Sequence, residues 1–162
     1  MHSRIFQLQV GAYCSDDVLD EDYFIEENPV SIADYYDGNT DYEEDMKWFE
    51  HTMKIPLERE EIEGKSIAYF VANKKVLNTL RESMRQRLDY LQTEVEKAKQ
   101  SFQSSEYPST DFWRIAEIAD PKTEVHFYCL GNSIMNRIGL YFFIRTYANK
   151  KIYIVNTIDY HS

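Results

Sequence analysis

The sequence contains few of the residues that form covalent cross-links, glycine-rich loops or membrane spans. Its 162 residues include two Cys, five Gly and four Pro. Because no secretion signal opens the chain, Cys14 and Cys129 are expected to be free thiols in the cytoplasm. No run approaches about 18 apolar residues, so no membrane span is expected. The glycines form none of the known phosphate-binding motifs, which argues against nucleotide chemistry of that kind.

Positive charge is also scarce in the first part of the chain. Residues 1–63 hold 4 Lys and Arg against 18 Asp and Glu, a net charge of −14, whereas residues 64–162 hold 14 against 10, a net charge of +4. An acidic protein repels phosphate backbones, so direct nucleic-acid binding is not expected. Either the two parts neutralise each other within the fold, or the acidic part faces a basic partner.

The hydrophobic pattern predicts the elements of one domain spanning residues 1–162. Strands are expected at 4–10, 65–72, 124–130, 139–147 and 151–158, with a hairpin turn at 148–150. Helices are expected at 41–53, 74–103 and 111–119, and residues 14–30 read as a surface loop with at most one helical turn. This order predicts an α+β fold, in which shorter helices and one long amphipathic helix pack on a mainly antiparallel sheet with N- and C-terminal strands.

The segment 74–103 carries the clearest pattern in the chain. Apolar residues recur every three or four positions from Leu77 to Phe102, which indicates one apolar stripe along a helix. The stripe is expected to cover the sheet, and a homodimer through residues 77–102 is a further expectation. Lys74, Arg81 and Arg85 lie along one edge of this helix, where they either bind an anion or form salt bridges with the acidic third.

Residues 37–44 combine a turn with a helix start. Thr40 and Glu43 have the spacing of a capping box. Asp37, Asn39 and Asp41 match the first ligands of a calcium-binding EF-hand loop, but the required Gly is Tyr42 and the required Glu is Trp48. A helix start is therefore favoured over a calcium site.

Two other patterns resemble catalytic or metal sites without completing them. His126 and Cys129 are three residues apart, and on a strand this offset places them on opposite faces, so a zinc site is not expected. Ser133 follows a Gly, as in a hydrolase nucleophile turn, and Asp159 and His161 come later in the order of a triad. Met135 replaces the second Gly, so this triad is not expected. No cofactor is expected either.

The remaining functional signal is the mixture of tyrosines and carboxylates in the N-terminal third. Tyr rings surrounded by charge suit a protein interface, whereas the alternative is that the rings are buried against the sheet. The candidate partner-binding residues are Tyr23, Tyr35, Tyr36, Asp37, Asp41 and Tyr42.

These observations favour a non-catalytic protein–protein interaction module whose acidic, Tyr-rich N-terminal third docks a basic partner. Inhibition of a nucleic-acid-binding protein is one role for such a surface. A small metal-assisted enzyme using Asp, Glu and His, and a homo-oligomeric assembly component built through the long helix, are the alternatives. The residues leave the identity of the partner or substrate open.

Overall fold

The computed structural model describes residues 2–27, 35–104, 115–116 and 125–161. The chain divides into two compact units, the first formed by residues 1–80 and 123–162 and the second by residues 81–122. Helix α3 (Lys74–Ser104) starts in the first unit and continues in the second. The expectation of one domain over residues 1–162 stays a prediction.

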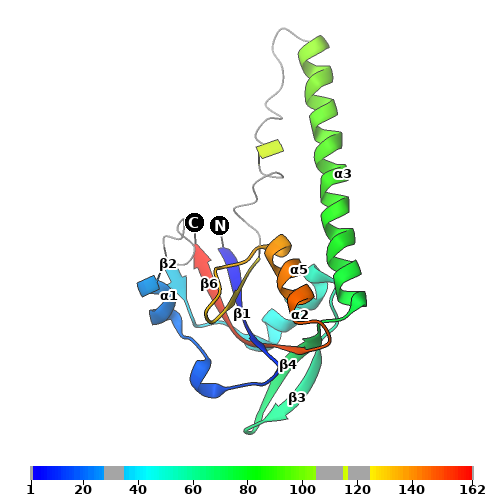
Figure 1. The fold of residues 1–162 in the computed structure, drawn as a ribbon. Helices are drawn as coiled ribbons and strands as arrows, with labels where there is room; N and C mark the ends of the chain where they lie inside the picture. The colour runs from blue at the N-terminus through cyan, green and yellow to red at the C-terminus, as the bar shows by residue number, and fades with distance from the viewer. Residues whose placement is uncertain (1, 28–34, 105–114, 117–124, 162) are drawn as a thin grey trace. The chain divides into compact units, whose positions relative to one another are not determined.

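A single sheet organises the first unit (Figure 1). Its strands are β1 (His2–Val10), β2 (Tyr35–Asp37), β3 (Glu58–Ile62), β4 (Lys65–Val71), β5 (His126–Cys129) and β6 (Lys151–His161). The strand order is β3-β4-β6-β1-β5, and β2 pairs with β6. All pairings in the described residues are antiparallel except that of β1 with β5. The predicted α+β fold with a mainly antiparallel sheet is confirmed.

Strand β6 lies at the centre of this sheet. One of its edges pairs with β1 along the full length of both strands, from Val10 opposite Ile152 to His2 opposite His161. Its other edge pairs first with β4 and then, at the far end of the strand, with β2. The β1–β6 register shifts between Gln7 and Leu8, as at a β-bulge.

The main core lies on one face of the sheet, under three helices. Helix α2 (Tyr42–Met53), helix α5 (Arg137–Thr146) and the start of α3 cover this face. Phe6 on β1 stacks with Phe127 and meets Phe49 of α2 edge-on, with ring centroids 6.2 Å and 5.2 Å apart. The buried cluster on this face is the largest of the three, so this face contains most of the described apolar core. Each fully buried side chain in it contributes roughly 1.5–3 kcal/mol of transfer free energy.

The opposite face carries two smaller aromatic clusters. In the first, Phe24 of helix α1 (Glu21–Glu27) packs on Tyr36, Tyr128 and Tyr160. In the second, Tyr69 and Tyr153 lie side by side and the segment that follows β1 packs over them. The 3-10 turn η1 (Ser15–Asp17) belongs to that segment. Helix α1 and η1 occupy the region that the sequence suggested was mostly loop, so helical structure is more extensive there than expected.

The prediction of a strand at residues 139–147 is wrong. This segment belongs to helix α5, and the turn at 148–150 therefore joins a helix to β6 rather than two strands of a hairpin. Aromatic and β-branched residues favour a strand locally. Their burial, however, follows a helical pattern, because Leu140, Phe143 and Ile144 face the core. The Asn136 side chain caps the helix by accepting hydrogen bonds from its first turn. Tertiary packing overrides the local propensity.

The proposed capping box at α2 is also corrected. Asp41, not Thr40, is the N-cap, and its carboxylate accepts hydrogen bonds from the backbone N–H groups of Glu43 and Glu44. The Thr40 hydroxyl instead bonds to Thr157 on β6, at 2.7 Å. The helix thus begins as predicted, but a different side chain caps it.

Two strands were not anticipated. Strand β3 is rich in Glu and Arg, and it joins β4 through Glu63 and Gly64, which both adopt positive φ. Positive φ at both turn residues is the geometry of a tight hairpin. Strand β2 is only three residues long. The predicted helix at 111–119 falls largely outside the described residues.

In the second unit, α3 carries ion pairs between residues three apart. Glu82 pairs with Arg85, Glu94 with Lys97 and Glu96 with Lys99. The expectation that Arg85 bonds to the acidic third is wrong, because its guanidinium is bound to Glu82 on the same helix. No helix in the described ranges combines the length and the apolar character needed to cross a bilayer.

Candidate functional site

The acidic residues of η1, α1 and β2, together with Asp20 just before α1, are here called the acidic surface of the first unit. Two of its parts are joined directly, because the Glu21 carboxylate of α1 accepts a hydrogen bond from the Gly38 backbone N–H after β2, at 2.6 Å. Its carboxylates are Asp16, Asp17, Asp20, Glu21, Asp22, Glu26, Glu27 and Asp37.

Two buried glutamines of β1 hold the segment that carries the first of these carboxylates. The Gln7 side chain donates to the Asp17 carbonyl and accepts from the Leu19 N–H, at 2.7 and 2.9 Å. The Gln9 side chain makes the same paired contact with the backbone of Cys14. Strand β1 therefore fixes the path of the chain into α1. Each buried side-chain amide uses both its N–H donor and its oxygen acceptor, so it holds the segment in one specific position.

Helix α1 is held by its aromatic residues. Phe24 is fully buried among Tyr36 and Tyr128, and the hydroxyl groups of Tyr23 and Tyr128 are 2.6 Å apart. Burial, reinforced by the bond to Tyr23, raises the pKa of Tyr128 well above its usual range. With Phe24 inward, α1 turns Asp22, Glu26 and Glu27 to solvent, and Ile25 between them is 55 % exposed.

Carboxylates from three elements converge at β2. The Tyr35 hydroxyl donates to the Asp37 carboxylate at 2.8 Å, and this bond raises the pKa of Tyr35. Glu21 of α1 accepts from the Gly38 N–H just after β2, and Asp159 of β6 lies opposite Asp37 in the strand pairing. Their negative charges raise the pKa of Tyr35 further. Hydrogen bonds from the Asn39 N–H and then from Tyr35 lower the pKa of Asp37, which keeps it ionised.

Arg4 is the cation that balances the carboxylates beneath this region. Its guanidinium Nε lies 2.8 Å from buried Asp45 of α2 and 3.5 Å from Asp159, and its guanidinium carbon lies 4.9 Å from the centre of the Trp48 ring. The Thr157 hydroxyl donates to the second oxygen of Asp45. The buried carboxylate is thus paired and hydrogen-bonded, as burial of a charge requires.

The predicted partner-binding residues divide into exposed and structural positions. Tyr35 is 51 % exposed and Asp37 is half-buried beside it, whereas Tyr36 is 6 % exposed and belongs to the core. Tyr23 is half-buried against Tyr128. Asp41 caps α2, and the Tyr42 hydroxyl donates to the Ile154 carbonyl and accepts from the Ala68 N–H.

Two further residues of this site, Asp159 and Ile25, were not among the predicted partner-binding residues. Asp159 comes from the opposite end of the sequence and reaches the site only because β2 pairs with β6, with Asp37 opposite Asp159. Ile25 is apolar and therefore resembles a core residue in the sequence. Local composition predicts neither which strands pair nor which position of a helix is exposed. The adjacent apolar residues Phe24 and Ile25 do indicate that one of the two faces outward, because neighbouring residues on a helix point in different directions.

The charge of the acidic surface is not neutralised within the fold. Among the described residues, none of its eight carboxylates forms an ion pair. The sequence has no Lys or Arg between Arg4 and Lys47. By contrast, Glu43 on α2 is bound by Arg59 and Glu60 on β3 by Lys151. Ion pairs within the fold therefore neutralise carboxylates of β3 and α2 but none of the acidic surface.

The candidate calcium ligands have structural roles. Asp37 accepts bonds from Asn39 and Tyr35, and Asp41 caps α2. In the described residues, no group of three or more His, Cys, Asp or Glu side chains is arranged to hold a metal ion.

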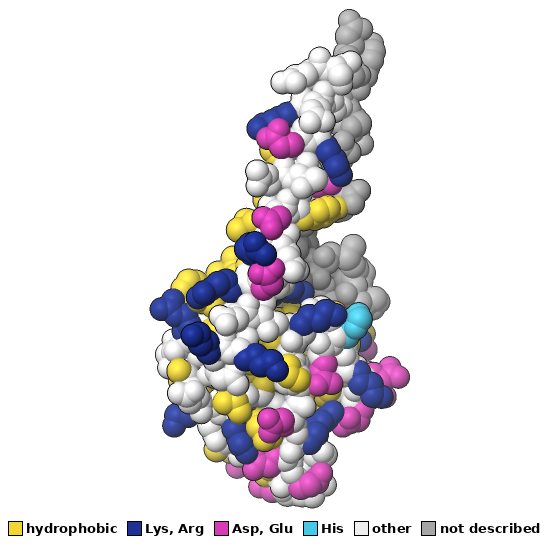
Figure 2. All heavy atoms as spheres, turned by 90° about the vertical axis from the view of Figure 1, so that its right-hand side faces the viewer, with side chains coloured by type: hydrophobic (Ala, Val, Ile, Leu, Met, Phe, Trp, Pro, Cys, Tyr) yellow, Lys and Arg dark blue, Asp and Glu magenta, His cyan; other side chains and the backbone are white. Residues whose placement is uncertain are grey.

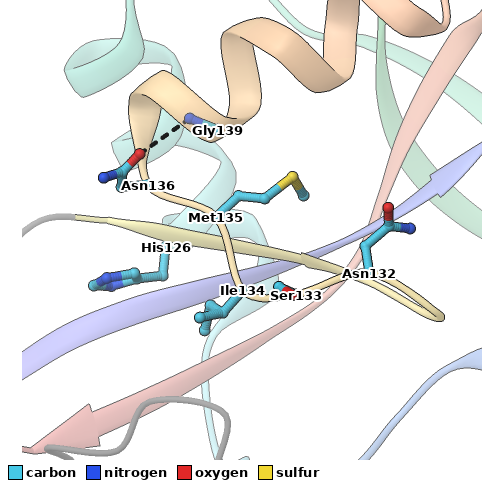
Figure 3. A pocket seen from close by; sticks show the side chains of 7 residues that line it. All are labelled: His126, Asn132, Ser133, Ile134, Met135, Asn136 and Gly139. Carbon is cyan, nitrogen blue, oxygen red and sulfur yellow. Dashed lines mark hydrogen bonds between the residues drawn. The ribbon is translucent and has the colours of Figure 1, made fainter.

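A pocket of about 440 Å³ lies between β5 and the start of α5 (Figure 3). His126 lines it and is bonded through Nδ1 to the Tyr160 hydroxyl at 2.9 Å, and burial lowers its pKa, so the ring is neutral at pH 7. Asn136 caps α5 by accepting from Gly139. The remaining lining residues are Asn132, Ser133, Ile134 and Met135.

The pocket does not bring the predicted catalytic or zinc residues together. Ser133 lines it, but in the described part of the chain no hydrogen bond joins Ser133 to His126. Asp159 pairs with Arg4 instead. Cys129 packs against the main core, on the face opposite to the Tyr160 ring that binds His126, as its offset on a strand predicted. The pocket shows no assembled nucleophile and base.

Comparisons with protein-family models, with curated proteins and with solved structures yield no match.

Proposed function

We propose that this protein is a non-catalytic binding module whose acidic surface docks a basic protein partner. The observation that carries the proposal is the set of eight carboxylates on η1, α1, β2 and the residue before α1 that form no ion pair among the described residues. Like charges held together without counterions cost free energy of folding, and a cationic partner removes that cost on binding.

Exposed apolar groups give the surface anchors as well as charge. Ile25 and Tyr35 are each more than half exposed, at 55 % and 51 %, and carboxylates surround both. Interfaces typically combine such anchors with a charged rim that steers the partner and sets its orientation. The partner proposed is a basic segment with at least one apolar side chain. If that segment normally contacts phosphates, docking here competes with nucleic acid.

The cytoplasm is the proposed location of this module. Cys14 and Cys129 are both free thiols in the structure, and Cys14 is exposed. A reducing compartment keeps an exposed thiol from forming a disulfide.

The test is capture from a lysate on immobilised protein, comparing the intact chain with the variant Asp22→Lys/Glu26→Lys. Both residues are exposed and make no side-chain contact that holds the fold. The matched control is Glu61→Lys/Glu63→Lys on the β3–β4 hairpin, which changes the net charge equally at another exposed place. Tyr36 is left intact because its removal would disrupt the core.

A partner retained by the intact chain and the control, lost in the α1 variant, and released by salt above about 0.5 M would support the proposal. Equal retention by the two variants, or retention that is insensitive to salt, would reject the acidic surface as the docking site.

Self-association through the second unit is a separate proposal. On α3, Leu88 is 64 % exposed and Phe102 is 52 % exposed, although both belong to the apolar stripe. Pairing of this stripe with a second copy would bury them. A sedimentation mass that rises with concentration and falls on Leu88→Lys would support the homodimer, and an unchanged monomer mass would exclude it.

A further inference from the structure

Helix α5 is apolar on its outer face as well as on its core face. Ile138, Tyr141, Phe142 and Arg145 follow the i, i+3, i+4, i+7 spacing of one helical stripe. Ile138 is 54 % exposed and Phe142 is 56 % exposed. The Arg145 guanidinium lies 5.9 Å and 6.0 Å from the ring centres of Tyr141 and Phe142. A helix that is apolar on both sides is typical of one that is covered on both sides.

Cations gather at the C-terminal end of this stripe. The Ala72 N–H donates to the Lys150 carbonyl, and the Asn149 N–H donates to the Ala72 carbonyl, so the turn after α5 lies against the start of α3. This contact brings Lys150 close to Lys74 and Lys75. In Figure 2, dark-blue cations and yellow hydrophobic side chains lie next to one another on the first unit. Lys74, Lys75, Arg145 and Lys150, here called the basic cluster, are all exposed, and none forms an ion pair within the described ranges.

The position of the two lysines is unfavourable for the helix that carries them. Lys74 and Lys75 are the first residues of α3, and its first turn contains no acidic residue. The N-terminus of a helix carries partial positive charge and favours carboxylates. A local arrangement that opposes helix stability is expected where a function requires it, and here that function is the display of positive charge.

The surface that complements the basic cluster is on the same unit. The acidic surface presents Ile25 among Asp22, Glu26 and Glu27, and the α5 stripe presents Ile138 and Phe142 next to cations. The two surfaces lie toward opposite ends of β6, because Asp37 pairs with Asp159 and Lys150 immediately precedes the strand. At about 3.3 Å per residue, Asp37 at one end of β6 is roughly 30 Å from Lys150 at the other end, which is several Debye lengths at physiological salt. The carboxylates of α1 and β2 and the basic cluster therefore act as separate local fields.

We propose that a second copy of this chain is a basic partner of the acidic surface, docking its α5 stripe and basic cluster on α1 of the first copy. This inference rests on the proposed function and identifies one partner for it. The contact joins two different surfaces, so it is head-to-tail and leaves one surface of each kind open at the ends of a chain of copies. Pairing α5 with α5 of another copy is disfavoured, because it would place one basic cluster near another.

The test uses two variants that each remove one surface. Asp22→Lys/Glu26→Lys removes the acidic side and Lys74→Glu/Lys75→Glu removes the basic side. The second pair places carboxylates at a helix N-terminus, so it should not unfold the protein. Sedimentation is measured at about 0.15 M salt, where remote charges are screened, and up to about 1 mM protein because small interfaces are weak.

The expected result is a mass that rises with concentration for the intact chain and a monomer for each variant alone. An equimolar mixture of the variants should associate again, because each pair of unlike variants retains one intact acidic surface and one intact basic cluster. A symmetric dimer differs from this pattern because its intact chain stops at two copies, whereas head-to-tail docking lets the mass of the intact chain grow beyond a dimer. The proposal is overturned if the intact chain stays monomeric, if the variants still self-associate, or if the mixture does not dimerise.

A separate arm distinguishes this inference from the proposed function. A labelled peptide that alternates Lys or Arg with Leu is titrated into the intact chain and into Asp22→Lys/Glu26→Lys. Peptide binding that only the intact chain shows, together with a monomeric intact chain, would overturn self-docking and leave the acidic surface as a site for other basic partners. Absence of both would overturn both proposals.

Discussion

Arg4 of β1 forms ion pairs with residues of strand β6 and helix α2. Its guanidinium lies between Asp45, whose side chain is 3 % exposed, and Asp159, and the Trp48 ring covers it. The Asp45 carboxylate has no other cation within ion-pair distance among the described residues. Removing Arg4 would leave a buried negative charge held only by Thr157.

The variant Arg4→Met is therefore expected to lower the free energy of unfolding by about 3 kcal/mol, the lower end of the cost of breaking a buried ion pair. Urea denaturation of the intact chain and the variant measures this loss. In the double variant Arg4→Met/Asp45→Asn much of the loss should be recovered, because the amide needs no counterion. Equal losses in the single and double variants would show that Arg4 acts through packing rather than charge.

His126 makes stability depend on pH. Burial lowers its pKa below the value of about 6.5 expected for the unfolded chain. Above that value both states are neutral and the folded state loses nothing. As the pH falls below it, the unfolded chain takes up the proton first, so stability decreases until the pH passes below the folded pKa.

The intact chain is thus expected to lose more stability between about pH 7 and pH 5 than His126→Asn, in which this titration is absent. The comparison is the pH slope of the urea midpoint, since the carboxylates contribute to both proteins alike. Parallel slopes would show that His126 titrates in the folded protein as it does in the unfolded chain.

Among the helices and strands, the sequence pattern predicts the correct element where local propensity and tertiary packing favour the same structure. The long helix α3, its start near residue 74, and strands β1, β4, β5 and β6 follow from periodicity. Helix α5 was misread because its aromatic and β-branched residues favour a strand, and only the position of the sheet shows which of them are buried. Strand β3 was missed because its charged residues pair with β4 at the edge of the sheet.

The candidate site could be predicted from the sequence only in part. Acidic composition located the acidic surface, but composition does not say which rings are buried. Tyr35 and Tyr36 are neighbours in a strand, so one points to solvent and the other into the core. The basic cluster could not be read from the sequence, because contact between the turn after α5 and the start of α3 brings its residues together.

The start of α3 offers a prediction at this scale. Lys74→Glu/Lys75→Glu should raise the free energy of unfolding by roughly 0.3–1 kcal/mol per residue, since carboxylates stabilise a helix N-terminus. Thermal denaturation at low salt measures the gain, which should shrink at high salt because salt screens the helix dipole. A loss of stability would mean that Lys74 and Lys75 support the fold directly.

For the whole molecule, the uneven charge predicts an unusual response to salt. The net charge is −10, and the acidic surface concentrates carboxylates that form no ion pairs in the described part of the chain. Screening weakens their mutual repulsion, so the melting temperature should rise as salt increases from about 0.01 to 0.2 M. Asp22→Lys/Glu26→Lys should flatten this rise more than Glu61→Lys/Glu63→Lys does, and equal slopes would place the repulsion elsewhere.

The central position of β6 also determines when the fold can form. Residues 2–10 must find their antiparallel neighbour among residues 152–161, so the sheet cannot close during synthesis until almost all of this sequence has left the ribosome. Until then the apolar faces of β1 and β4 have no shared neighbour, and pairings this distant in sequence form slowly. A nascent chain stalled before residue 150 should therefore be sensitive to protease and depend on chaperones, whereas release of the next ten or so residues should confer resistance in one step.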